Sequence, residues 1–233
     1  MKIIKSLIII LLILLTILTY KYLELYKDST QNKNIINRTL KDIEIEKNYN
    51  EGLNKLLELN SDTVGWLFVN GTNINYPVLQ TNNNQYYLSH NFNKDSNKEG
   101  WIFMDYKSNI DDLTYNTIIY GHNTYNDNMF SSLNNILTKS WYENSNNYLI
   151  TLYTLEKKTT WLVFSIYKIE KETYYLQNNF SSEDDYLKFL DIIKERSIYN
   201  FNTEIDYNTK ILTLTTCADN SNYRVVLHAK LLN

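Results

Sequence analysis

The sequence predicts a mainly β domain whose strands close, or nearly close, into a barrel. Short apolar runs broken by Asn and Gly recur from residue 61 onward, and helical patterns are few in this part. Pro is nearly absent (1), whereas Tyr is abundant (21). A chain of 233 residues has room for one good-sized domain with appendages. We expect a membrane anchor over residues 1–22, a stalk and N-terminal helical segment over residues 23–60, and the β-barrel over residues 61–233.

The N-terminal segment is expected to anchor the chain in a membrane. After Lys2 and Lys5, residues 6–20 carry no charge and span roughly 22 Å as a helix, against a hydrocarbon core of about 30 Å. Snorkelling of Lys5 extends the span, and Tyr20 and Tyr22 suit the opposite interface. A cleaved signal peptide is the alternative, but no small-x-small cleavage site follows the run. We therefore expect an uncleaved anchor, with the N-terminus inside the cell and the large remainder outside.

The segment that follows the anchor is expected to contain one or two helices. It is rich in Lys, Glu, Asn and Leu, and its Leu and Ile residues lie at mixed helical spacings over residues 40–59. A solvated stalk is the alternative for residues 21–36.

The rest of the chain contains eight strand candidates and one strong helical pattern. The helix is expected over residues 181–197, where Ser181 or Ser182 can cap it and acidic residues fill its first turn. Its residues Tyr186, Phe189, Leu190 and Ile193 form one apolar face. A second, short helix is expected over residues 126–137. The strand candidates are Gly65–Val69, Tyr76–Leu79, Gly100–Met104, Asn116–Tyr120, Tyr148–Leu155, Thr160–Ile169, Lys210–Thr216 and Tyr223–Leu231.

Charge and cysteine content exclude several classes of function. A net charge of −3 gives no electrostatic footprint for nucleic acid. One cysteine excludes an intramolecular disulfide. With one Cys and three dispersed His residues, we expect no metal site and no cofactor.

The single cysteine, Cys217, ends an alternating strand. Most free cysteines are small buried hydrophobes, and that is the plain alternative here. Because alternate side chains of a strand share a face, Leu212 and Leu214 are expected toward the core, with Cys217 on the other side. By the same parity Arg224, seven residues later, points away from the apolar face of the next strand. A guanidinium near a thiol favours the thiolate, which is the form that attacks carbonyls.

A cysteine nucleophile needs a proton carrier, which is usually a histidine. His90 lies in a polar loop and is expected to face solvent. His228 shares the parity of Arg224 but lies roughly 13 Å away along the strand. His122 directly follows a strand, and Gly121 allows a sharp turn that can present the imidazole at the strand end. Spacing alone favours His122 only narrowly.

Several motifs resemble the sortase family. The stretch "TLTTC", with an arginine seven residues on, resembles the sortase signature, and "YGHN" resembles the segment that carries the sortase histidine. Over residues 53–233 the chain is most similar to class B sortases, through "NSDTVGWLFVNGTNINYPVLQ", "NQYYLSHNF", "KEGWIFMDY" and "IIYGHNTYNDNMFSSL" in that order. It departs from them at Thr215, where serine is common, and at Trp101, where a small residue is usual. These departures leave the substrate motif open.

The resemblance implies an eight-stranded sortase-type barrel that acts as a cysteine transpeptidase of the Gram-positive cell surface. It implies that Cys217 attacks the threonine carbonyl of a C-terminal sorting motif related to NPQTN or LPxTG, giving a thioacyl enzyme. His122 would transfer the protons, and Arg224 would bind the substrate carbonyls and the developing oxyanion. Five further residues match substrate-groove positions of the family, with ordinary packing as the alternative for each: Asn84, Leu88, Tyr175, Leu176 and Thr215.

The implied partners are secreted proteins with a C-terminal sorting signal, an amine of the peptidoglycan precursor or cell wall, and the lipid bilayer around the anchor. Two alternatives remain at this point. One is a sortase-like hydrolase or pilin ligase, and the other is a catalytically idle surface-binding barrel on a membrane stalk. The complete set of Cys217, His122 and Arg224 argues against an idle barrel.

Overall fold

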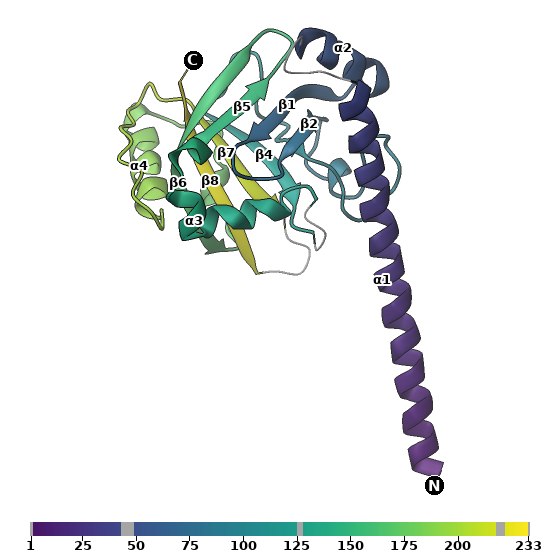
Figure 1. Ribbon diagram of the computed structural model, residues 1–233. Coiled ribbons are helices and arrows are strands. Elements are labelled where there is room, and N and C mark those ends of the chain that lie inside the picture. Colours follow the sequence, from purple (N-terminus) through teal and green to yellow (C-terminus); the bar gives the residue numbers. More distant parts are fainter. Residues whose placement is uncertain (1, 43–48, 125–127, 218–221, 233) are drawn as a thin grey trace.

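Eight strands form a closed barrel in the order β1-β2-β3-β4-β7-β8-β6-β5 (Figure 1). The computed structural model describes residues 2–42, 49–124, 128–217 and 222–232. All eight predicted strands are present, with their ends within three residues of the prediction. Their bounds are β1 Thr63–Val69, β2 Asn75–Leu79, β3 Phe103–Met104, β4 Asn116–His122, β5 Leu149–Tyr153, β6 Lys158–Glu170, β7 Ile211–Cys217 and β8 Tyr223–Leu231.

Two of the strand pairs are parallel, β2 with β3 and β4 with β7, and the other pairs are antiparallel. The β4–β7 pair joins segments that are far apart in the sequence, because β5, β6 and several helices lie between them. The C-terminal ends of β4 and β7 therefore meet at one end of the barrel. Since β8 is antiparallel to β7, β8 begins at this same end.

Strand β3 starts later than predicted, at Phe103 rather than at Gly100. Gly100 has a φ of 55°, in the left-handed region that glycine adopts without penalty. A Cβ atom at this position would lie 2.2 Å from the carbonyl oxygen of Tyr87. The chain thus turns at Gly100, and the Trp101 N–H donates to that same oxygen (2.9 Å), before pairing in the sheet begins.

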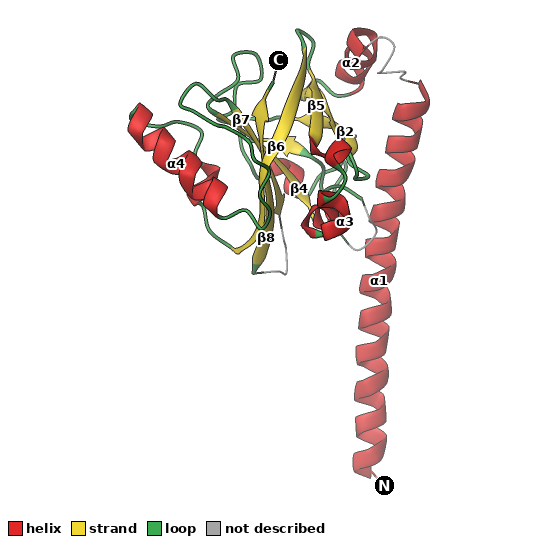
Figure 2. Cartoon of the chain, turned by 60° about the vertical axis from the view of Figure 1, so that its left-hand side comes forward, coloured by secondary structure: helices red, strands yellow, loops and turns green. Residues whose placement is uncertain are grey.

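Both faces of the sheet at β6, β7 and β8 are buried. Leu212 and Leu214 pack inside the barrel, as predicted. The other face was expected only to point away from the apolar core, and it lies under helix α4, Glu183–Glu195, which covers it from outside (Figure 2). This second apolar layer comprises Phe164, Tyr167, Tyr175, Tyr186, Phe189, Leu190, Ile193, Ile211 and Val226. The parity argument assumed a sheet with one covered face, and α4 makes that assumption wrong here.

The inserted helix α4 forms for the predicted reasons. Ser182 caps it by accepting a hydrogen bond from the Asp185 N–H (3.1 Å), and three acidic residues occupy its first turn. The four predicted apolar residues of its inner face are all buried. The short helix expected over residues 126–137 is instead a 3₁₀ helix, η2, over Ser131–Leu137, while residues 126 and 127 lie outside the described residues. The other short helices are η1 Tyr86–Leu88, α3 Lys139–Tyr142, η3 Ser145–Tyr148 and η4 Tyr174–Leu176.

The N-terminal helices lie on the side of the barrel opposite α4 (Figure 1). Helix α1, Lys2–Asp42, projects far beyond the barrel, and α2, Tyr49–Leu59, packs on β1. Within the described part of α1, residues 4–37 are long and apolar enough to cross a membrane by length and composition. Further along, Asp28, Ser29, Asn32 and Ile35 are buried against the barrel. The alternative of a solvated stalk is therefore wrong for this part of residues 21–36.

Candidate active site

The parallel pairing of β4 and β7 places His122 next to Cys217. Seven successive residue pairs are in register, from Asn116 with Ile211 to His122 with Cys217. Neighbouring strands of a sheet lie about 4.8 Å apart, so the two residues are adjacent across the ladder. Sequence spacing favoured His122 over the other histidines as the proton carrier only narrowly. The register adds a physical argument, because it places His122 next to the cysteine.

Arg224 is the second residue of β8, the strand on the other side of Cys217. The antiparallel pairing of β7 and β8 runs as far as Thr215 opposite Val226. Two residues further along β7 and two residues back along β8, the same register sets Cys217 opposite Arg224. Arg224 is half-buried, and its guanidinium Nη1 donates to the carbonyl oxygen of Tyr223 at 3.1 Å. The residues between the two strands are mainly 218–221, which lie outside the described residues, as does the Cys217 side chain.

His122 is the last residue of β4, and its side chain is only 4% exposed. Its carbonyl oxygen accepts a hydrogen bond from the Phe130 N–H (2.9 Å), so the chain folds back immediately after the strand. Gly121 does not make the predicted sharp turn, because it lies within β4 and pairs with Thr216. The glycine is required for a different reason. A Cβ atom there would lie 2.6 Å from Cγ of the buried Phe130 ring.

The other two histidines have surroundings that separate them from this site. His228 is completely buried, with Nε2 2.8 Å from the Tyr167 hydroxyl and Nδ1 2.8 Å from the Thr213 hydroxyl. Burial, and then the positive charge of Arg196, lower the pKa of His228 to about 3. His90 is half-buried rather than fully solvated. Its ring stacks on that of Tyr86 at 4.1 Å.

Two of the five predicted groove residues contact each other directly. The Tyr175 hydroxyl lies 3.2 Å from the hydroxyl of Thr215, and both side chains are buried. Leu176 follows Tyr175 in η4 and is half-buried between the two apolar layers. Thr215 lies two residues before Cys217 on β7, so this group stands beside the strand end that carries the cysteine.

Asn84 joins the same region through two residues that sequence reasoning did not single out, Asp105 and Tyr120. The Asn84 amide and the Tyr120 hydroxyl both donate to Oδ2 of the buried Asp105, each at 2.8 Å. Tyr120 pairs with Thr215 across the β4–β7 ladder. An acidic residue directly after an apolar strand, as in "IFMDY", was the available signal for Asp105. Leu88 is half-buried and packs against the barrel core.

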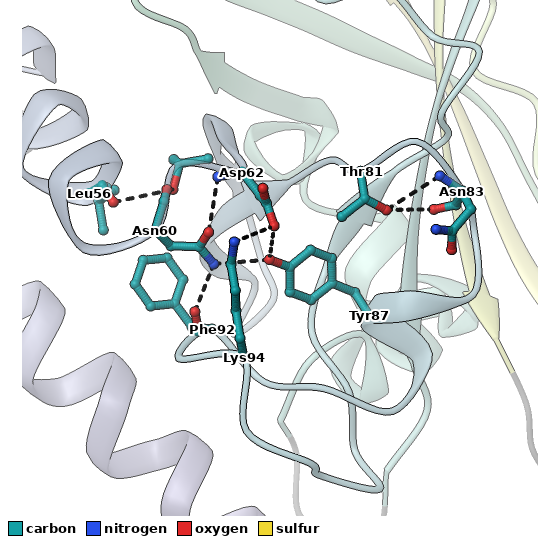
Figure 3. A network of polar contacts seen from close by, with 9 residues as sticks. Leu56, Asn60, Asp62, Thr81, Asn83, Tyr87, Phe92 and Lys94 are labelled. Carbon is teal, nitrogen blue, oxygen red and sulfur yellow. Dashed lines mark hydrogen bonds and ion pairs between the residues drawn. The ribbon is translucent and has the colours of Figure 1, made fainter.

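A polar network holds the segment that carries Asn84 and Leu88 (Figure 3). The Asn60 amide donates to the Tyr87 hydroxyl at 3.0 Å, and that hydroxyl donates to Asp62 Oδ2 at 2.6 Å. Lys94 forms an ion pair with the same carboxylate at 2.9 Å. Burial, and then the bond to Asp62, raise the pKa of Tyr87 above its usual value, so the phenol remains a donor. The network ties this segment to the start of β1.

Among the described residues, no group of three or more His, Cys, Asp or Glu side chains is arranged to hold a metal ion.

A closed eight-stranded barrel in which a histidine strand and a cysteine strand run parallel and end side by side has the architecture of the sortase-type cysteine transpeptidases. The sequence matches the Sortase domain over residues 67–232. The chain is 31% identical over 232 residues to Sortase B of Staphylococcus aureus, covering 96% of this chain and 94% of that protein. It is 35% identical over 191 residues to Sortase B of Listeria monocytogenes, with 77% and 74% covered.

Solved structures agree with these sequence matches. The Staphylococcus aureus sortase B–substrate complex is similar with a TM-score of 0.80 and 30% identity, covering 91% of this chain and 99% of that chain. Sortase B of Clostridium perfringens is similar with a TM-score of 0.72 and 35% identity, covering 77% and 99%. The chain therefore belongs to the sortase family, and its class B relatives make it a cysteine transpeptidase.

Proposed function

We propose that this sortase is anchored in the membrane by residues 1–22 and joins secreted proteins to the cell wall through their C-terminal sorting signals. The observation that carries the proposal is the register of β4 and β7, which sets His122 beside Cys217. The catalytic barrel, residues 61–233, lies outside the cell in this proposal. The apolar helix over residues 4–37 supports the anchor.

The first half of the proposed reaction cleaves the sorting motif. The Cys217 thiolate attacks the carbonyl carbon of the motif's threonine, forming a C–S bond while the carbonyl electron pair moves to oxygen. When this intermediate collapses, the C–N bond to the next residue breaks, and the departing amine takes a proton from the His122 imidazolium. The product is a thioester between Cys217 and the secreted protein.

The second half transfers the acyl group to an amine of the peptidoglycan precursor or cell wall. The amine attacks the thioester carbonyl while neutral His122 removes a proton from the amine. An amide bond forms, the C–S bond breaks, and Cys217 leaves as the thiolate. In both halves Arg224 donates hydrogen bonds to the oxyanion, a charge-assisted contact that strengthens as negative charge develops. A solved sortase B complexed with a short glycine peptide supports an amine acceptor.

Substrate recognition is assigned to Asn84, Leu88, Tyr175, Leu176 and Thr215, on a motif related to NPQTN or LPxTG. The direct contact between the hydroxyls of Tyr175 and Thr215 beside the Cys217 strand supports one wall of a groove. The chain of contacts from Asn84 through Asp105 to Tyr120 supports the opposite wall.

The test uses the only thiol in the chain. Fluorogenic NPQTN and LPxTG peptides are incubated with the full-length protein in detergent, with and without an amine acceptor, and products are identified by mass spectrometry. We expect cleavage and amine-linked product, complete labelling of native protein by a methanethiosulfonate, and loss of cleavage and labelling in Cys217→Ala. Cleavage without amine-linked product would indicate the hydrolase alternative. No cleavage, with a thiol that reacts only after denaturation, would indicate an idle barrel with a buried cysteine.

A further inference from the structure

Helix α1 is fastened to the barrel through a buried polar interface. Its residues Asp28, Ser29, Asn32 and Ile35 are spaced along one face of the helix, and all four are buried where α1 meets the barrel. Three of the four are polar. Because a buried polar group costs free energy unless hydrogen bonds replace its water, such an interface favours one docked arrangement over others.

The centre of this interface is the carboxylate of Glu99, which is 3% exposed. Its Oε2 accepts hydrogen bonds from the side-chain amides of Asn32 on the helix (3.4 Å) and Asn128 on the barrel (3.2 Å). Burial raises the pKa of Glu99, and the hydrogen bonds from Asn128 and Asn32 oppose that rise. Asn97 contacts the helix as well, donating to the Asp28 carbonyl (3.2 Å) and to Asn32 Oδ1 (3.1 Å), and its Oδ1 accepts a hydrogen bond from the Glu99 N–H (2.9 Å).

Asn128 contacts both the helix and the carboxylate of Glu99. In addition to Glu99, its Nδ2 lies 2.9 Å from the Ser29 hydroxyl and 3.3 Å from the Ser29 carbonyl oxygen. Asn128 is 3% exposed, so water cannot readily replace these partners. Helix α1 thus supplies two of the three acceptors of the Asn128 amide.

The residues after Asn128 are bound to the end of the strand that carries His122. Met129 forms a β-bridge with Asn123, and the Phe130 N–H donates to the His122 carbonyl oxygen at 2.9 Å. Met129 has a φ of 51°, and its N–H donates to the Tyr76 hydroxyl at 3.0 Å. A non-glycine residue in the left-handed region is strained, so its surroundings must hold this turn in place.

We propose that Asn128 is a positioning residue for His122, and that docking of α1 sets this position through Ser29 and Glu99. The inference rests on the proposed catalytic role of His122. The path runs from Ser29 to the Asn128 amide, along the main chain to Phe130, and from there to the His122 carbonyl. A misplacement of about 1 Å can cost on the order of 10²-fold in rate. Turnover thus depends on the membrane-proximal helix, although α1 supplies no group to the reaction itself.

The test compares two buried amides of the same interface in the full-length protein in detergent micelles. Asn128→Ala removes the amide that is connected to the His122 strand end. Asn97→Ala removes one that contacts α1 and the main-chain N–H of Glu99, but that bonds neither the Glu99 carboxylate nor the end of the His122 strand. Melting temperature, kcat, KM and the pH profile of kcat/KM are measured for both with a fluorogenic sorting peptide, below the melting temperature of each. We expect comparable losses of melting temperature, but a fall in kcat/KM of about tenfold or more and a displaced pH profile only for Asn128→Ala.

A milder pair of helix variants covers the case in which Asn128→Ala does not fold. Ser29→Ala removes the acceptor nearest the Asn128 amide. Gln31→Ala removes a different helix contact, the 3.2 Å bond to Asp95. A fall in kcat/KM for Ser29→Ala with Gln31→Ala near wild type supports the proposal. Equal kcat/KM within either pair of variants overturns it. If His122→Ala retains wild-type turnover, the proposed function fails instead, so the two failures are distinguishable.

Discussion

Replacing His228 by glutamine is expected to remove part of the acid sensitivity of folding. The imidazole is completely buried between the Tyr167 hydroxyl of β6 and the Thr213 hydroxyl of β7, and Arg196 adds a nearby positive charge. Its pKa is lowered from 6.5 to about 3 in the folded protein. Between these two values the unfolded chain binds a proton that the folded chain does not, so the free energy of unfolding falls as the pH falls. At pH 5, about 1.5 units below the unfolded pKa, the loss is about 2 kcal/mol.

The assay is urea unfolding of the full-length protein in detergent, followed by the fluorescence of its buried tryptophans, at pH 7.5 and pH 5. The glutamine amide can donate one hydrogen bond and accept another, but it does not titrate. We expect the wild type to lose about 2 kcal/mol more stability than His228→Gln over this interval. His90→Ala serves as the control, and its loss should equal that of the wild type. Equal losses in the wild type and His228→Gln would refute the reasoning.

Three further predictions concern the site itself. His122→Ala should lower kcat/KM for a sorting peptide by about 10²–10⁴-fold, whereas His90→Ala should stay within a few-fold of wild type. Equal losses in the two variants would mean that His122 is not the proton carrier. Arg224→Lys keeps the charge but loses the planar two-donor fork. We therefore expect kcat/KM to fall by about 10²–10³-fold, while the pH dependence of Cys217 alkylation barely changes. Near-normal turnover would mean that Arg224 acts only through its charge. Gly121→Ala places a Cβ atom 2.6 Å from Cγ of the buried Phe130 ring. Urea unfolding should therefore show a free energy of unfolding that is lower by about 1–3 kcal/mol. An unchanged unfolding midpoint would show that the ring can move aside.

The strands were predictable because local chemistry determines them. Alternating apolar residues broken by Asn and Gly marked all eight strands, and an N-cap serine with an acidic first turn marked α4. The start of β3 was missed because an isolated Gly100 does not reveal a left-handed φ until its contact with Tyr87 is known. Likewise, the sequence "SSLNNIL" does not distinguish an α-helix from the 3₁₀ helix that forms.

Long-range packing could not be predicted in the same way. Parity placed His228 away from the barrel core, which is correct, but it could not show that α4 buries that face as well. The adjacency of His122 and Cys217 depends on a parallel pairing across the intervening strands and helices, and no spacing in the sequence encodes it. The buried face of α1 depends on partners in residues 95–100 and at Asn128. Because these partners are distant in the sequence, the polar sequence of this part of α1 was equally consistent with a solvated stalk.

The order of strands in the barrel explains why the three proposed catalytic residues form one site. β4, β7 and β8 are consecutive, so the cysteine strand lies between the histidine strand and the arginine strand. A slip of one residue in either pairing would move every side chain of a strand to the opposite face, so the site requires a fixed register. Thr213 of β7 supplies that constraint, because its hydroxyl donates to Asn116 of β4 at 2.6 Å and lies 2.8 Å from His228 of β8. All three side chains are completely buried, and any slip would leave them without these partners at a cost of about 1–3 kcal/mol each. The buried polar row therefore fixes the two registers on which the site depends, and His228 contributes to the site from a distance, through the alignment of strands.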